Sequence, residues 1–132
     1  MQASRFGAGL GLLLWAAASP GVAHAAVTED NFQLRSATDL LTLCTADPTD
    51  RLMTAAANFC HGYALGVFQT LDEEQGGMRS KLFCITEPRP TRTQAIAAFV
   101  DWLKPKQDVQ SMRPADAILA YLRDAYPCGK KR

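Results

Sequence analysis

Apolar residues recur at steps of three and four from about residue 36 to the end of the chain, as they do along one face of an α-helix. No run alternates apolar and polar residues in the manner of a half-buried strand. The pattern predicts an all-α fold, a small bundle of four main helices. We expect these helices at about residues 36–44, 50–74, 91–104 and 114–126.

Several helix ends carry their own signals. Thr91 and Gln94 match a capping box, in which a hydroxyl and an amide satisfy each other's free backbone groups at a helix start. Pro114 suits the first turn of the last helix. Gly76 and Gly77 are expected to end the longest helix, because glycine readily adopts the left-handed conformation found at helix C-termini.

The longest expected helix is apolar over most of its surface. One stripe consists of Leu52, Ala56, Phe59, Tyr63, Val67 and Leu71. The opposite side is also largely apolar, which predicts a central helix wrapped by the others. Gly62 and Gly66 share one face of this helix. Because mid-helix glycine lowers helix stability, we expect these two residues to let another helix or an aromatic side chain approach the backbone closely.

The N-terminus is typical of an export signal. Arg5 precedes an uncharged apolar run, which is too short to span a membrane, and Ala23-His24-Ala25 is a cleavage motif. The chain then divides into a signal peptide (1–25), a loosely ordered lead-in (26–35) and a single helical domain (36–132). We therefore expect a periplasmic protein.

Charge narrows the classes of partner. Removal of 25 of the 132 residues leaves 107, the size of one small domain. The chain has 14 basic and 13 acidic residues, and Arg5 is the only charged residue of the leader, so the mature protein is neutral. Neutrality argues against nucleic acid or an anionic membrane as the main partner. The first cysteine is Cys44, so we expect no lipid anchor at the cleavage site.

The four cysteines are Cys44, Cys60, Cys84 and Cys128. An even count in a small exported chain is typical of a disulfide framework. Cys44 ends the first helix and is closest in the chain to Cys60. The fourth helix should return Cys128 to the connection that contains Cys84. Among the three possible pairings we therefore favour Cys44–Cys60 with Cys84–Cys128.

Cys60 and His61 are the most conspicuous candidates for chemistry, but their pattern argues against it. A c-type haem needs a second cysteine where Ala57 stands. Zinc needs further ligands at short spacings. Neighbours on a helix point about 100° apart, so this pair is poorly placed as a nucleophile and its base. A serine hydrolase triad cannot be assembled either, because the mature chain has no histidine besides His61 to pair with a serine. We predict no catalytic, metal or cofactor site and no enzymatic activity.

The end of the longest helix offers a candidate partner loop. Three acids stand at the C-terminal end of the helix, where the helix dipole disfavours negative charge. Two interpretations stay open: the acids mark a solvated helix end, or they belong to a loop that recognises a partner. The loop would consist of Asp72, Glu73, Glu74, Gln75, Gly76, Gly77, Met78, Arg79 and Ser80.

Several landmarks together resemble a known family. They are Leu40-Leu41-x-x-Cys44, Phe59-Cys60-x-Gly62-Tyr63-x-x-Gly66-Val67, Phe83-Cys84, Thr93-Gln94 and Ala125-Tyr126-Pro127-Cys128. In this order they resemble the Rap/Tai-type immunity proteins of type VI secretion, over about residues 38–128. The resemblance implies a periplasmic, often dimeric protein that binds and blocks a secreted effector, frequently a peptidoglycan amidase. The landmarks define the scaffold, so the resemblance transfers no partner-binding residue.

Two other classes of function stay open. A small helical periplasmic chaperone or stress protein would share the size and the disulfides, and a family member could lack an immunity role. A chaperone triggered by low pH would need groups that titrate near neutral pH, and His61 is the only mature histidine. A redox protein or enzyme would need a free reactive thiol.

Overall fold

The computed structural model describes residues 25–129, which contain helices and no strand. The elements are the 3-10 helix η1 (Glu29–Gln33) and the α-helices α1 (Ala37–Cys44), α2 (Met53–Gly76), α3 (Arg92–Leu103), α4 (Gln107–Gln110) and α5 (Pro114–Ala125). The predicted all-α fold is therefore confirmed. The signal-peptide prediction falls on residues that lie, apart from Ala25, outside the described part of the chain.

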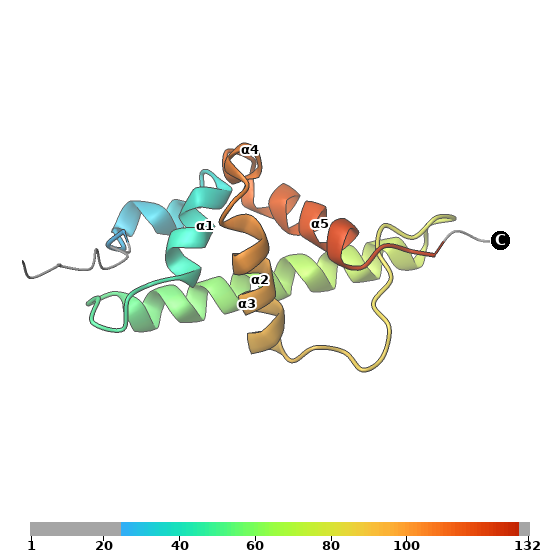
Figure 1. Ribbon diagram of the computed structural model, residues 1–132, viewed down its shortest axis with the longest axis horizontal. Helices are drawn as coiled ribbons and strands as arrows, with labels where there is room; N and C mark the ends of the chain where they lie inside the picture. The colour runs from blue at the N-terminus through green and yellow to red at the C-terminus, as the bar shows by residue number, and fades with distance from the viewer. Residues whose placement is uncertain (1–24, 130–132) are drawn as a thin grey trace, which may run out of the picture.

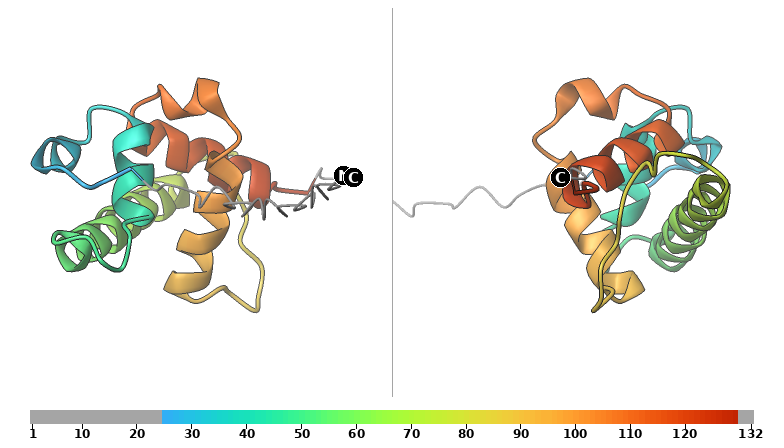
Figure 2. Two further views of the ribbon diagram at one scale, coloured as in Figure 1. Left: turned by 60° about the vertical axis from the view of Figure 1, so that its left-hand side comes forward. Right: turned by 90° about the vertical axis from the view of Figure 1, so that its right-hand side faces the viewer.

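The helix α2 runs along the length of the molecule, and α1, α3 and α5 all pack on it (Figure 1). Seen end-on, α2 lies at one side of the bundle and not in its centre (Figure 2). Its buried residues are Ala56, Cys60, Ala64 and Gln75. The prediction of a central helix wrapped by the others is therefore wrong. Small residues at four-residue steps let the neighbouring helices approach closely, whereas the larger side chains, such as Phe59, lie at the flanks and stay partly exposed.

The helix ends agree with the sequence in part. Thr91 and Gln94 form the predicted capping box at the start of α3, and Pro114 begins α5. Gly77, at the end of α2, has a φ of −88° and is right-handed. The prediction of a left-handed glycine at this helix end is therefore wrong. The turn after α2 closes instead through hydrogen bonds from the backbone N–H of Gly77 and Met78 to the last carbonyls of the helix.

The sequence pattern did not predict α4, which has four residues and is too short to show a period. It lies between α3 and α5 and buries Val109. The side-chain amide of Gln110 donates hydrogen bonds to the carbonyls of Leu103 and Lys104, at 3.1 and 2.8 Å. This contact caps the C-terminus of α3, where helical carbonyls lack partners.

The described residues form two neighbouring hydrophobic cores. The larger joins all five α-helices and the segment after α2; Leu40, Phe83 and Leu103 are fully buried in it or nearly so. The smaller consists of Val27, Leu43, Ala56 and Cys60. Disulfides join Cys44 to Cys60 and Cys84 to Cys128. These are the pairs that the expected order of the helices favours.

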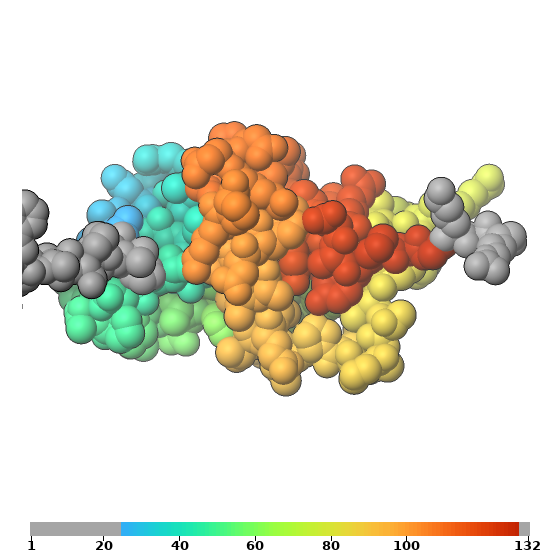
Figure 3. Space-filling model, viewed as in Figure 1, coloured from blue at the N-terminus to red at the C-terminus, as the bar shows by residue number. Residues whose placement is uncertain are grey.

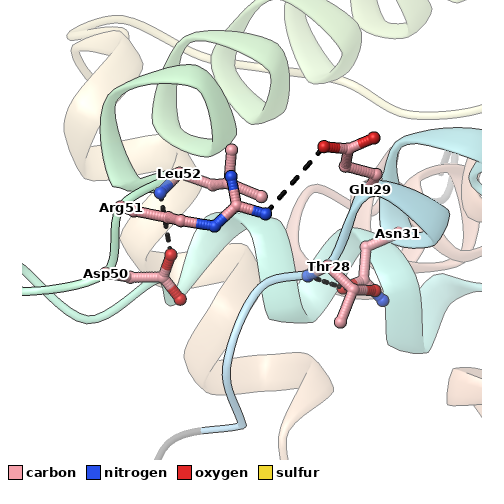
Figure 4. Close-up of polar contacts among 6 residues, drawn as sticks. All are labelled: Thr28, Glu29, Asn31, Asp50, Arg51 and Leu52. Atoms are coloured by element: carbon pink, nitrogen blue, oxygen red, sulfur yellow. Dashed lines mark hydrogen bonds and ion pairs between the residues drawn. The ribbon is translucent and has the colours of Figure 1, made fainter.

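The lead-in at 26–35 differs from our expectation of a loosely held segment. Val27 is buried, and its N–H donates to the Oδ2 atom of Asp50 at 2.8 Å. Figure 4 shows the other oxygen of Asp50 directed at the N–H of Leu52, and Glu29 facing Arg51. The Arg51 guanidinium lies 3.9 Å from the Glu29 carboxylate. The hydrogen bond from Leu52 and then that from Val27 hold the pKa of Asp50 below its usual value. One carboxylate thus fastens the N-terminal segment to the start of α2.

Candidate partner-binding surface

The predicted partner loop spans the last turn of α2 and the residues after it, at one tip of the molecule (Figure 1). Glu73 and Glu74 are exposed on the helix, and Met78 is 43% exposed beside Arg79 and Ser80. Methionine and arginine are common in protein interfaces. Of the side chains at this tip, Met78 and Arg79 are therefore the ones typical of a contact surface.

Gln75 must be removed from the predicted loop. It is 4% exposed, and its Oε1 atom accepts hydrogen bonds from the backbone N–H of Leu82 and Phe83, at 3.0 and 3.2 Å. Its amide donates to Asp72 at 3.0 Å. Gln75 is therefore a structural clamp that ties the returning chain to α2. It supports the exposed tip and is not available to a partner.

Cys60 and His61 do not form a pair of a free thiol and an imidazole. Cys60 is fully buried and is bonded to Cys44, while His61 is half-buried on the neighbouring side of α2. Within residues 25–129, no group of three or more His, Cys, Asp or Glu side chains is placed to hold a metal ion. The same residues contain no free cysteine.

Gly62 and Gly66 lie on open surface. A Cβ atom added to either residue would meet no other heavy atom within 4 Å, leaving aside the backbone of its own helix turn. The prediction that they admit a neighbouring helix or aromatic ring within the chain is therefore wrong. They line a shallow groove together with Tyr63 and Val67 of α2 and Ala115 of α5.

Tyr63, which lines this groove, and Phe59 are two other predicted packing residues. Burial is the main cause that raises the pKa of Tyr63, and the carboxylate of Asp116 adds to it. Phe59 is 37% exposed and packs edge-to-face on Phe32 of η1, with 5.3 Å between ring centres. Both side chains thus contribute to packing from partly exposed positions.

A second surface feature was not found from the sequence. An apolar pocket of about 320 Å³ lies between α2, α3, α5 and residues 85–90. Figure 3 shows α3, α5 and the segment after α2 meeting on one face of the molecule. Of the fourteen lining residues, twelve are apolar or aromatic, and the other two are Arg89 and Arg92. Periodicity alone does not reveal such a pocket, because its residues come from four separate segments.

None of the helices in residues 25–129 combines the length and the apolar character that crossing a membrane requires.

The sequence model of the Rap1a immunity proteins matches residues 36–128, from the N-cap of α1 to the last cysteine. Neither a curated protein nor a solved structure matches the chain. The matched region includes both disulfides, all five α-helices and the candidate loop.

Proposed function

Because the chain belongs to the family of Rap1a immunity proteins, whose role is to bind and neutralise a secreted effector, we propose that it acts in the periplasm against a peptidoglycan amidase delivered by type VI secretion. The observation that carries the proposal is the family match, which spans the whole bundle from α1 to the second disulfide.

Two features support the periplasm as the place of action. The first 25 residues have the charge, apolar run and cleavage motif of an export signal. The two disulfides join all four cysteines of the chain, and such bonds persist in oxidising compartments such as the periplasm. The choice of an amidase as the effector rests on the resemblance alone.

The tip formed by the end of α2 is the surface that we assign to the effector. It offers Met78, 43% exposed, next to the exposed acids Glu73 and Glu74. The Gln75 clamp and the disulfide at Cys84 hold its base. A surface that is ordered before binding loses less conformational freedom when the complex forms.

Growth of cells that export the toxin tests the proposal. The product of a toxin gene beside this one is exported to the periplasm with and without this protein. We expect rescue of growth by the wild type, loss of rescue with Met78→Asp, and rescue with Met112→Asp. Met112 is the matched control because it is also 43% exposed but lies between α4 and α5. If cells die equally with and without the wild type, the immunity proposal is wrong for that pair.

The proposal includes a homodimer, as the resemblance implies. Gly62 and Gly66 leave the backbone of α2 uncovered, so the α2 helix of a second copy could approach it closely. Sedimentation velocity of the wild type and of Gly66→Leu tests this arrangement. Leucine fits the monomer because the site is open, so we expect the variant to fold and to sediment as a monomer. Monomeric wild type, or a dimer unchanged by Gly66→Leu, would exclude this interface.

A further inference from the structure

We propose that the apolar pocket between α2, α3, α5 and residues 85–90 binds a single-chain amphipathic anion, an acyl chain with a carboxylate head such as a medium-chain fatty acid. This site lies outside the α2 tip, and the proposal does not depend on the immunity role.

The pocket has the size and walls of a small-molecule site. Its volume of about 320 Å³ falls at the lower end of the range of about 300–1,000 Å³ for such sites, which are mainly apolar with a few polar groups. The lining includes Phe68 from α2, Ile96 from α3, Ile118 from α5 and Ile85 from the segment after α2. An unbranched apolar chain suits these walls.

The polar groups of the pocket are cationic. Arg89 and Arg92 line it, and no carboxylate does. Arg89 faces Glu87 at 3.3 Å in an exposed pair, a contact that water screens strongly. Arg92 is the first residue of α3, whose first turn contains no acid. A cation is unfavourable at a helix N-terminus, so the position of Arg92 does not serve helix stability. Two guanidinium groups at an apolar pocket favour a carboxylate head.

Three aromatic rings, Phe99, Tyr121 and Tyr126, form part of the pocket wall. Tyr121 is 6% exposed and lies between Phe99 and Tyr126, with ring centres 5.5 and 6.1 Å away. Burial raises the pKa of Tyr121, and a hydrogen bond to the side chain of Tyr126 raises it further. The Tyr121 hydroxyl is thus paired with Tyr126, and both rings line the pocket. An acyl chain that packs on these rings does not take the Tyr121 hydroxyl from its partner.

The wall made by residues 85–90 is fixed at both ends. Cys84 is bonded to Cys128, and its N–H donates to the carbonyl of Tyr126 at 2.8 Å. At the other end, Thr91 and Gln94 close the capping box of α3. The pocket is thus formed before a ligand arrives, which lowers the ordering cost of binding.

Calorimetry with two ligands of equal chain length tests the proposal. The full mature protein is titrated with decanoate and, separately, with the decyltrimethylammonium cation. We expect decanoate to saturate one site with a Kd below about 1 mM, and the cation to bind at least about tenfold more weakly, because a like charge faces the two arginines.

Two variants locate the site. Ala95→Trp places a large side chain in the pocket and should abolish decanoate binding; Ala98→Trp, on the exposed side of the same helix, is its control. Arg92→Ala should weaken binding about tenfold, as expected for the loss of a charge-assisted hydrogen bond, whereas the exposed Arg123→Ala should not. Thermal melts of all four establish that they fold. Because Arg92 is a surface residue, its variant keeps the test valid if Ala95→Trp does not fold.

Three results would overturn the proposal. They are the absence of saturable decanoate binding at about 1 mM, equal binding of the decyl cation, and wild-type affinity in both pocket variants. If decanoate does not bind but Ala95→Trp abolishes neutralisation of an effector, the pocket is a docking site for a protein side chain, and the fatty-acid proposal is wrong.

Discussion

The two ends of the molecule are held together in different ways. At the N-terminal end, Cys44–Cys60 links residues 16 apart, and Leu43 and Cys60 are fully buried in a small closed core. At the loop end, Cys84–Cys128 links residues 44 apart, and Phe83 is the main buried anchor beside an open pocket. One end is closed by packing. At the loop end, the Cys84–Cys128 disulfide and the Gln75 side chain hold in place a surface that packing leaves exposed. A binding surface must be both exposed and held in place.

The largest effect should come from the disulfide of the loop end. Replacing Cys84 and Cys128 together by alanine opens a loop of 44 residues. On the chain-entropy relation this lowers the free energy of unfolding by about 4 kcal/mol. Urea unfolding of wild type and variant measures the difference. Hydrogen exchange should also accelerate at residues 82–91. A variant that unfolds at the wild-type urea concentration would remove the contrast between the two ends.

The disulfide of the N-terminal end should matter less. Replacing Cys44 and Cys60 by alanine opens a loop of 16 residues, which corresponds to about 3 kcal/mol on the same relation. Hydrogen exchange should change near α1 and the first half of α2 and leave the loop end protected. Exchange that spreads equally through both ends would show that they unfold as one unit.

The Gln75 clamp should have an intermediate effect. Gln75→Leu leaves the N–H groups of Leu82 and Phe83 without their acceptor, and Phe83 is 1% exposed. We expect a loss of about 2 kcal/mol in the free energy of unfolding, the usual cost of a buried unsatisfied donor. Gln69→Leu, at an exposed position of α2, is the control. Equal stability of the two variants in urea would contradict the role of the clamp.

The smallest effect concerns Asp50, which fastens the N-terminal segment. Its folded pKa lies below the ordinary value of 3.8, so its carboxylate stabilises the fold above that pH, and the contribution is lost as the pH falls through the folded pKa. The Tm of Asp50→Asn should be lower than that of the wild type at neutral pH, and the gap should narrow below pH 3.8. A gap that is independent of pH would exclude the carboxylate as its cause.

Local chemistry explains which features the sequence could predict. The capping box at Thr91 and the proline at position 114 act within one helical turn, so their effects can be inferred from short segments. The cysteine pairs followed from the order of the helices and the positions of Cys44 and Cys128 along them. The family resemblance rested on the same scaffold residues, and the match to Rap1a immunity proteins agrees with it.

The errors concern features that depend on the packed chain. The apolar pattern of α2 did not reveal which side of the helix faces the core, because small and large apolar residues occur on most of its sides. Whether Gly62 meets a neighbour depends on where α5 lies. The role of Gln75 depends on the path of residues 77–83, which no local pattern determines. The pocket arises only when four separate segments meet.

Calorimetric titration with the purified effector tests the central claim most directly. The product of a neighbouring toxin gene is titrated with wild type, Met78→Asp and the control Met112→Asp. We expect saturable binding with a Kd below about 1 μM for the wild type and the control, and at least about tenfold weaker binding for Met78→Asp. No binding by the wild type at this concentration, or equal affinity of all three proteins, would contradict an immunity protein that acts through the tip of α2.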